Sequence, residues 1–246
     1  MVDSKTAAQP LHCLVIIPAY NEANEIGDVI SQLHKQGFDV VVIDDNSADD
    51  TAKIVKQHGA TLLQHCSNMG YGVALQTGYR YAIQKKYERV VQMDGDGQHS
   101  PQFVKTLIDA LDEKQVDLVI GNRHMMVGSY KVPRHRRAGQ KLFSTLLHMF
   151  SGLKIDDPTS GFQALRRNVL KFYVSDLFPD DFPDANILLL CRRMGFKIVE
   201  VPVVMHESNG VSMHRGFWRP IFYVTLIFFS ILVGMFTKLP KREDEN

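Results

Sequence analysis

The chain has 246 residues, of which 45% are hydrophobic and 22% are charged, and its formal net charge is +1. This length suits one large domain or one domain with an appendage, and the composition is typical of a globular protein with a full core. Because the chain is almost neutral, nothing indicates a nucleic-acid partner. The three cysteines are widely spaced, without metal-finger spacing, and are expected to be reduced thiols.

Strand and helix signals alternate through the first half of the chain. Short runs rich in Val, Ile and Leu predict buried strands, and segments with apolar residues at helical spacing follow them. This order predicts an α/β fold with a mostly parallel central sheet flanked by helices. The predicted strands are 11–17, 38–45, 60–65 and 89–94, and the helices between them are 21–37, 47–59 and 72–86.

The second half continues the pattern with less regularity. No internal repeat or interdomain linker interrupts it, and the stretch 125–153 is the least regular part. The predicted elements are helix 101–115, strand 116–124, a turn, short strand and helix over 157–173, helix 184–195 and strand 196–205.

The strand predicted over 89–94 ends in two aspartates, within the sequence VVQMDGDGQHSPQ. Mg²⁺ and Mn²⁺ take one or two carboxylates together with substrate phosphates, so Asp94 and Asp96 are candidate metal ligands. Gly95 lets the backbone come close to a bulky diphosphate, and Gln98 offers an amide oxygen. A solvated acidic turn is the alternative. The position favours a metal site, because parallel strands carry their sites at their carboxyl ends.

Two other strand ends are expected at the same edge of the sheet. Pro18–Glu22 follows the first strand and Asp44–Asn46 follows the second. The first of these loops is not a GxGxxG turn, which disfavours a dinucleotide dehydrogenase. P-loop, GxSxG and metalloprotease signatures are absent as well.

Six segments in order carry a family resemblance. They read VIIPAYNEANEI, VVVIDDNSADDT, NMGYGVALQTGYRYA, VVQMDGDGQHSPQ, VIGNRH and DPTSGFQALRR. Together they resemble a family 2 glycosyltransferase of the GT-A (Rossmann-like) fold, in the branch of the dolichyl- and polyprenyl-phosphate sugar synthases. The resemblance covers about residues 12–215. It implies transfer of a sugar from a UDP- or GDP-linked donor, with Mg²⁺ or Mn²⁺ and inversion at the anomeric carbon.

The resemblance assigns the nucleotide to the first two strand ends. Pro18, Tyr20 and Glu22 resemble the first nucleotide-binding loop of the family. Ile43 and Asp45 resemble the pair that holds the base and the ribose, with Asp45 suited to accept an N–H of the base. The alternatives are that Pro18 merely terminates a strand and that Asp45 caps the helix 47–59.

The diphosphate and the metal are assigned to the third strand end. Asp94, Gly95, Asp96 and Gln98 resemble the family's D-x-D-x-Q site, and Asp96 is a catalytic candidate through the metal. Arg123 resembles an arginine after the fifth strand, where a fixed guanidinium can pair with a phosphate through two hydrogen bonds. The alternative for Arg123 is a surface ion pair.

The late segment HESNGVSMHRG departs from the family. The synthases often carry an Arg and a Lys here, whereas this chain has Glu207 and Met213 at those positions. His214 and Arg215 are the nearby residues that could replace them.

Asp184 precedes a segment that resembles the acceptor helix of the family. If the acceptor is a sugar hydroxyl, a general base is needed, and Asp184 is the candidate. If the acceptor is a lipid phosphate, it is already an anion and needs no base. The alternative is that Asp184 caps the helix 185–194.

Two segments indicate a membrane. The uncharged run 220–237 predicts a hydrophobic helix of about 27 Å that could span a bilayer, lie in its interface, pack on a membrane helix of a partner, or be buried in the core. Basic residues over 131–141, Lys131 among them, precede apolar 142–150 and predict an interfacial helix, with an ordinary amphipathic surface helix as the alternative.

These observations predict an N-terminal tail (1–10), a GT-A domain (11–215) and a membrane-associated or partner-binding helix with its tail (216–246). The expected enzyme works at the cytoplasmic face of a membrane, as a peripheral protein or with a single C-terminal helix anchor. It would glycosylate a polyprenyl phosphate or, alternatively, the hydroxyl of a glycan or glycolipid. A small membrane protein or a second copy is a possible partner. The alternative of another class is a non-catalytic nucleotide-sugar-binding subunit, which the intact D-x-D-x-Q site disfavours.

Overall fold

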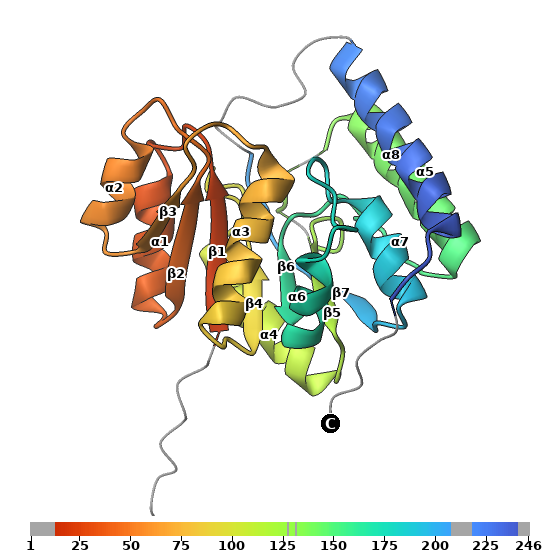
Figure 1. Cartoon of the computed structure of the whole chain (residues 1–246), viewed down its shortest axis with the longest axis horizontal. Coiled ribbons are helices and arrows are strands. Elements are labelled where there is room, and N and C mark those ends of the chain that lie inside the picture. Colours follow the sequence, from red (N-terminus) through yellow and green to blue (C-terminus); the bar gives the residue numbers. More distant parts are fainter. Residues whose placement is uncertain (1–12, 127, 131, 208–217, 241–246) are drawn as a thin grey trace, which may run out of the picture.

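The computed structural model describes residues 13–126, 128–130, 132–207 and 218–240. It contains a seven-stranded sheet in the order β3-β2-β1-β4-β6-β5-β7 (Figure 1). The predicted tail 1–10 and the expectations for Lys131, Met213, His214 and Arg215 lie outside the described residues. The strands are β1 (Cys13–Ala19), β2 (Asp39–Asp44), β3 (Thr61–Gln64), β4 (Arg89–Gln92), β5 (Leu118–Asn122), β6 (Gln163–Arg166) and β7 (Ile198–Pro202).

The predicted α/β class is confirmed, and most of the sheet is parallel. β1 pairs with β2 and β4, β2 with β3, and β5 with β7, all in parallel. β6 runs antiparallel to both β4 and β5, a reversal that the sequence analysis did not predict. The carboxyl ends of β1, β2, β4 and β5 therefore meet at one edge.

Helices cover both faces of the sheet. They are α1 (Ile26–Lys35), α2 (Thr51–Gln57), α3 (Tyr71–Gln84), η1 (Pro101–Phe103), α4 (Val104–Glu113), α5 (Arg134–Ser151), α6 (Arg167–Tyr173), α7 (Ala185–Arg193) and α8 (Trp218–Phe236).

Two hydrophobic cores lie on opposite faces of the sheet, because alternate residues of a strand point to opposite sides. Leu14 and Ile16 of β1 belong to the core under α3, α5, α6, α7 and α8. Val15 and Ile17 belong to the core under α1 and α4. Strands buried on both faces explain why the sequence shows continuous apolar runs in place of alternation.

α3 packs directly on the sheet through a glycine. A Cβ added to Gly78 would lie 2.4 Å from Cγ2 of Ile16 and 3.0 Å from Cδ1 of Ile43. A side chain at this position would have to push α3 away from β1 and β2. Because α3 begins beside the carboxyl edge, its seat on the sheet also positions residues at that edge.

α5 and α8 lie side by side at one end of the molecule (Figure 1). Ile227 and Ile231 of α8 are fully buried in the core against α7. The outer face of the same helix leaves Phe229 and Val233 58% and 66% exposed. The sequence analysis left a membrane-spanning segment over 220–237 open; within the described ranges, no helix has both the length and the apolar character that a membrane crossing needs.

We expect Gly78→Ala to lower the free energy of unfolding. Alanine improves helix propensity by about 1 kcal/mol, but overpacking against Ile16 costs roughly 1–3 kcal/mol. Gly139→Ala in α5 is the matched control, since its Cβ would meet nothing closer than Val224 Cγ2 at 4.0 Å. Urea denaturation of both variants measures the difference. A Gly78→Ala protein as stable as the Gly139→Ala protein would show that α3 shifts without cost.

Candidate functional site

A cleft of about 800 Å³ opens at the carboxyl edge of the sheet. Its walls come from the ends of β1, β2, β4 and β5, from α3, α5 and α8, and from the segment that precedes α7. The structure brings ten of the sequence-predicted residues into this cleft: Pro18, Tyr20, Glu22, Asp45, Asp94, Gly95, Asp96, Gln98, Arg123 and Asp184. Ile43 is the exception, because its side chain is buried in the core beside Gly78 and does not line the cleft.

Tyr71 and His99, to which the sequence alone assigned no role, hold Asp94 in place. The hydroxyl of Tyr71 donates to Oδ1 of Asp94 at 2.9 Å, and the Asp94 amide donates to Nδ1 of His99 at 3.0 Å. His99 is buried and stacks on Phe162 with ring centroids 5.0 Å apart. Burial lowers the pKa of His99 to about 4, so the ring is neutral and Nδ1 can accept a hydrogen bond. Asp94 therefore has a fixed orientation.

Asp96 closes the turn that carries the two carboxylates. Its Oδ1 accepts the amide of Gln98 at 2.9 Å, and Gly97 between them has a φ of +74°, which favours glycine. The backbone carbonyl of Gln98 in turn accepts the amide of His206 at 2.8 Å, so the turn is anchored to the chain that follows β7.

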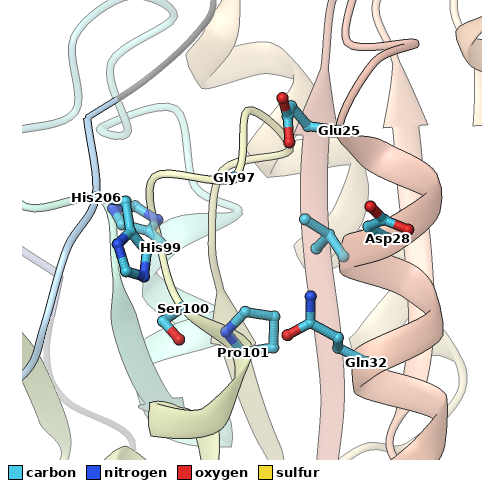
Figure 2. Close-up of a pocket in the computed structure, with 9 residues that line it drawn as sticks. Glu25, Asp28, Gln32, Gly97, His99, Ser100, Pro101 and His206 are labelled. Atoms are coloured by element: carbon cyan, nitrogen blue, oxygen red, sulfur yellow. The ribbon is translucent and has the colours of Figure 1, made fainter.

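A smaller cavity of about 160 Å³ lies behind this turn (Figure 2). Glu25 and Asp28 approach it from one side, and His99 and His206 from the other. Among the residues that the structure describes, no group of three or more His, Cys, Asp or Glu is arranged to hold a metal. Mg²⁺ and Mn²⁺ typically take one or two carboxylates together with substrate oxygens, and two is the number of carboxylates that Asp94 and Asp96 offer.

Negative charge is concentrated where the ends of β1 and β4 line the cleft. Burial, together with the charges of Asp96 and Asp94, raises the pKa of Glu22 to about 8. Burial also raises the pKa of Asp94, although the Tyr71 hydroxyl and the charge of Arg123 oppose this. A cluster of carboxyls that resists full ionisation fits a bound divalent cation, which would neutralise it.

Asp45 is bound by donors of the chain itself. Its Oδ1 accepts hydrogen bonds from Nδ1 of His65 at 2.7 Å and from the amide of Met69 at 2.8 Å. Its Oδ2 accepts a hydrogen bond from the amide of Gly70 at 2.9 Å. These contacts fix the loop that leads into α3. The predicted bond from a base N–H would have to use the lone pairs that remain. The capping alternative for Asp45 is wrong, since Asp44 accepts the amide of Ser47.

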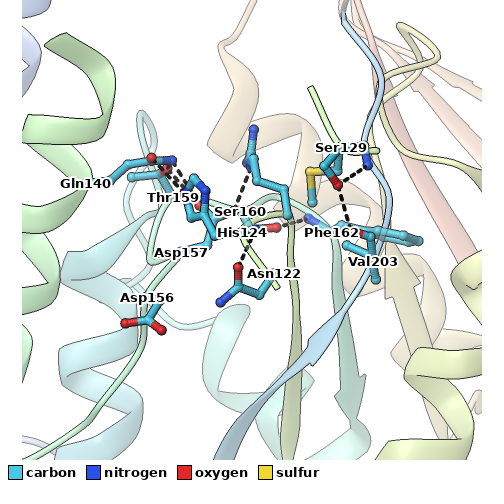
Figure 3. A network of polar contacts seen from close by, with 12 residues as sticks. Asn122, His124, Ser129, Gln140, Asp156, Asp157, Thr159, Ser160, Phe162 and Val203 are labelled. Carbon is cyan, nitrogen blue, oxygen red and sulfur yellow. Dashed lines mark hydrogen bonds and ion pairs between the residues drawn. The ribbon is translucent and has the colours of Figure 1, made fainter. Parts of the chain in front are cut away.

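Arg123 lies in a buried network at the end of β5. Its Nε donates to Oδ2 of Asp157 at 2.6 Å, with the two side chains only 10% and 0% exposed. Gln140 of α5 donates to the other oxygen, Oδ1 of Asp157, at 3.0 Å (Figure 3). The carboxylate of Glu200 accepts the amide of Asp157 at 2.8 Å. The surface ion pair considered above is therefore wrong, and Arg123 is fixed against the cleft wall.

Asp184 stands just before α7 but does not cap it with its side chain. Instead, Oδ1 of Asn186 accepts the amides of Asp184 and Ile187, each at 2.9 Å. Oδ2 of Asp184 accepts the hydroxyl of Tyr223, on α8, at 2.6 Å. Burial raises the pKa of Asp184 to about 6, and the hydrogen bond from Tyr223 opposes the rise. The capping alternative is wrong, and the carboxylate is directed into the cleft.

Sequence reasoning missed several residues that position the predicted ones. Tyr71 and Asp157 lie inside segments that were quoted for the family resemblance, so their place in a motif was a usable signal. Gln140 and Tyr223 lie outside those segments, and nothing in their spacing pointed to the site.

The family model for glycosyl transferase family 2 matches residues 14–174. The chain belongs to this family. It is a glycosyltransferase, like its named relatives. Polyprenol monophosphomannose synthase from Mycolicibacterium smegmatis is 30% identical over 226 residues, covering 87% of this chain and 85% of the relative. A UDP-N-acetylglucosamine–dolichyl-phosphate N-acetylglucosaminyltransferase from Methanococcus voltae is 27% identical, covering 82% and 88%.

Solved structures share the fold of this glycosyltransferase. Glucosyl-3-phosphoglycerate synthase from Mycobacterium tuberculosis, in complex with Mn²⁺, UDP-glucose and phosphoglyceric acid, superposes with a TM-score of 0.68. It is 22% identical, and the match covers 92% of this chain and 80% of that one. A likeness at this identity establishes the architecture of the glycosyltransferase and leaves its substrates to be argued from the site.

We expect Asp157→Asn to destabilise the glycosyltransferase by about 3–5 kcal/mol, because it leaves the Arg123 guanidinium buried without its counter-ion. Asp50→Asn is the matched control: its pair with Lys53 is 3.6 Å long and both side chains are at least 66% exposed. Exposed pairs contribute little, so the control should keep the wild-type stability. Thermal denaturation compares the two, and equal melting temperatures would contradict the structural importance of the buried pair.

Proposed function

We propose that this glycosyltransferase transfers a sugar from a nucleoside diphosphate donor to a polyprenyl phosphate, with inversion at the anomeric carbon and with Mg²⁺ or Mn²⁺. The observation that carries the proposal is the composition of the cleft. Carboxylates for a metal line its donor side, while α5 and α8 form its acceptor side, where α8 has an apolar outer face and α5 exposes basic residues. The names of the relatives, which include polyprenol and dolichyl-phosphate transferases, support the same acceptor class.

The donor side is suited to hold a diphosphate as it leaves. Asp94 and Asp96 would hold the ion with the donor phosphates, and Tyr71 keeps Asp94 in place. When bound, the ion offsets the negative charge that develops on the diphosphate. Arg123, fixed through its Nε, faces the same cleft and can bind a phosphate with its other N–H groups.

The acceptor phosphate attacks the anomeric carbon on the face opposite the diphosphate. An oxygen of the phosphate forms the new bond to this carbon, the bond to the diphosphate breaks, and the nucleoside diphosphate leaves with the electron pair. Because a phosphate is already anionic, this reaction needs no general base on the protein.

A second candidate acceptor is a hydroxyl group of a glycan or glycolipid. One observation favours it: Asp184 lines the cleft with a pKa raised to about 6, which suits a general base near neutral pH. Asp184→Asn separates the two reactions. Transfer to a hydroxyl would fall by a factor of roughly 10²–10⁴, whereas transfer to a phosphate would not lose a base.

The apolar outer face of α8 and the basic start of α5 support peripheral binding to a membrane, at the side where donor nucleotides are present. Phe222, Phe229 and Val233 form an exposed apolar stripe on α8. Exposed Arg134 and Arg137 at the start of α5 add positive charge suited to anionic headgroups. A small membrane protein or a second copy of the chain are the other occupants that this surface would fit.

Asp96→Asn should abolish metal-dependent transfer and leave the fold intact. The substitution keeps the size of the side chain and removes the charge that a divalent ion requires, so a loss of at least about 10²-fold is expected. The assay follows transfer from UDP- and GDP-linked sugars to a polyprenyl phosphate with Mn²⁺, and circular dichroism checks the fold. Asp109→Asn is the control, because Asp109 pairs with Lys105 at an exposed site on α4 and does not line the cleft. Unchanged turnover of Asp96→Asn would remove the metal assignment.

Phe229→Ser with Val233→Ser should weaken binding to anionic phospholipid vesicles. Each substitution removes apolar area, worth about 25 cal/mol per Å², that would be buried in the interface. Substitution tests this more cleanly than deletion of 216–246, because deletion would also expose the core around Ile227 and Ile231. Vesicle flotation of the full chain measures the effect.

Met69→Ser, at an exposed residue on the donor side, is the control for the vesicle experiment. If both proteins float equally, α8 does not contact the bilayer. Loss of a dimer or of a bound membrane protein, without loss of vesicle binding, would assign the stripe to that partner instead.

A further inference from the structure

Helix α8 is held firmly against α7. Its Gly234 lets the two helices approach closely, since an added Cβ would lie 3.3 Å from Leu189 and 3.4 Å from Leu190. Arg193 of α7 donates to the carbonyl of Gly234 and, at 3.0 Å, to that of Thr237. These bonds satisfy carbonyls at the end of α8 that have no partner within the helix. The position of α8 relative to the cleft is therefore well defined.

Tyr223 projects from the other end of α8 into the cleft. Its ring packs edge-on against Phe143 of α5, with ring centroids 5.8 Å apart, and against Phe182 at 5.0 Å. With the ring fixed on two sides, the hydroxyl has a defined direction, and its 2.6 Å bond to Asp184 is short and charge-assisted.

Asp184 is surrounded by groups of both signs. Asp157 and Asp94 face it and disfavour its ionised form, while Arg123 and the Tyr223 hydroxyl favour it. The positive charge of Arg136 on α5 also acts on Tyr223. The Tyr223 hydroxyl donates a hydrogen bond to Oδ2 of Asp184. We therefore assign Oδ1 as the oxygen that would accept a hydrogen bond from a bound substrate.

We propose that Tyr223 is a positioning residue that holds the Asp184 carboxylate to accept a hydroxyl group of the transferred sugar, so that α8 forms part of the sugar subsite. The identity of this hydroxyl rests on the proposed function: a polyprenyl phosphate carries no hydroxyl, so near the anomeric carbon the available hydroxyls are those of the sugar. An ionised carboxylate is a strong acceptor for such a group. Asp184 touches the substrate in this assignment, and Tyr223 acts through it.

Binding of nucleotide sugars, compared with binding of the bare nucleotides, tests this assignment. The full chain is titrated with UDP-N-acetylglucosamine and GDP-mannose, and with UDP and GDP, each with Mn²⁺. Asp184→Asn should weaken binding of the matching nucleotide sugar by roughly tenfold, the effect of a hydrogen bond to a charged group. Tyr223→Phe should weaken it several-fold. Neither variant should change the affinity for the bare nucleotide.

The matched control is Tyr87→Phe. Tyr87 donates to Oδ2 of Asp39 at 2.9 Å, at an exposed site that does not line the cleft. This variant removes the same kind of Tyr–Asp hydrogen bond and should bind both ligands as the wild type does. Tyr223→Phe in the Asp184→Asn background should add no further loss, because the two residues act as one unit.

A second measurement does not depend on any substrate. Carbon-13 NMR of the aspartate carboxyls, with Asp184→Asn to assign the signal, follows the titration of Asp184. Tyr223→Phe removes a donor to the ionised form, so the pKa of Asp184 should rise further, by about one unit for a hydrogen bond of this kind. Tyr87→Phe should leave it unchanged.

The proposal is overturned if Tyr223→Phe leaves both the pKa of Asp184 and the ratio of the two affinities at wild-type values. It is also overturned if Tyr223→Phe weakens binding equally with and without Asp184. If the variants behave as expected while polyprenyl phosphate proves not to be an acceptor, the role of Tyr223 stands and only the acceptor assignment fails.

Discussion

The crowding of carboxylates at one edge of the sheet is the constraint on which the site depends. Glu22 follows β1, and Asp94 and Asp96 follow β4, two strand ends that parallel pairing brings together. Burial and the charges of the two aspartates raise the pKa of Glu22 to about 8. Ionising several neighbouring carboxyl groups away from water costs free energy. The fold tolerates it because Tyr71 and Arg123 oppose the charge on Asp94, and a metal–diphosphate complex would offset the rest. The proposed donor side would therefore gain most from a positive charge that binds together with the substrate.

The cleft forms only where the first and second halves of the chain meet. The ends of β1, β2 and β4 line the proposed donor side, whereas α5, the segment before α7 and α8 come later in the sequence and close the cleft. The buried pair of Arg123 and Asp157 lies at the junction, and Gln140 of α5 completes it. Gln140 and Glu200 also form hydrogen bonds with Asp157, so the positions of the two side chains are set by these directed bonds as well as by the attraction between their charges. The place at which Arg123 could bind a phosphate therefore depends on the position of α5, through Asp157 and Gln140.

The sequence was enough to predict the α/β class and the edge at which the site forms, because runs such as VVVIDD combine a buried strand with a polar end. It was not enough for side-chain direction. Ile43 precedes Asp44 in a strand buried on both faces, so no alternation of polarity shows that its side chain enters the core. The contact between Tyr223 and Asp184 depends on which face α8 turns toward α7, and the local sequence of neither helix determines this orientation. Because the Asp184 side chain binds Tyr223, it makes no capping bond to α7.

The two faces of α8 serve different environments. Tyr223 and Ile227 turn inward, to the cleft and the core, while Phe222 and Phe229 turn outward. Arg193 bonds to the end of α8 and the Tyr223 hydroxyl bonds to Asp184 near its start, so the helix is joined to the rest of the cleft wall at both ends. If the acceptor is presented by a bilayer as proposed, the surface that would meet the lipid and the carboxylate that would meet the sugar lie on opposite sides of α8. Lipid docking and sugar binding would then be connected through the packing of this one helix.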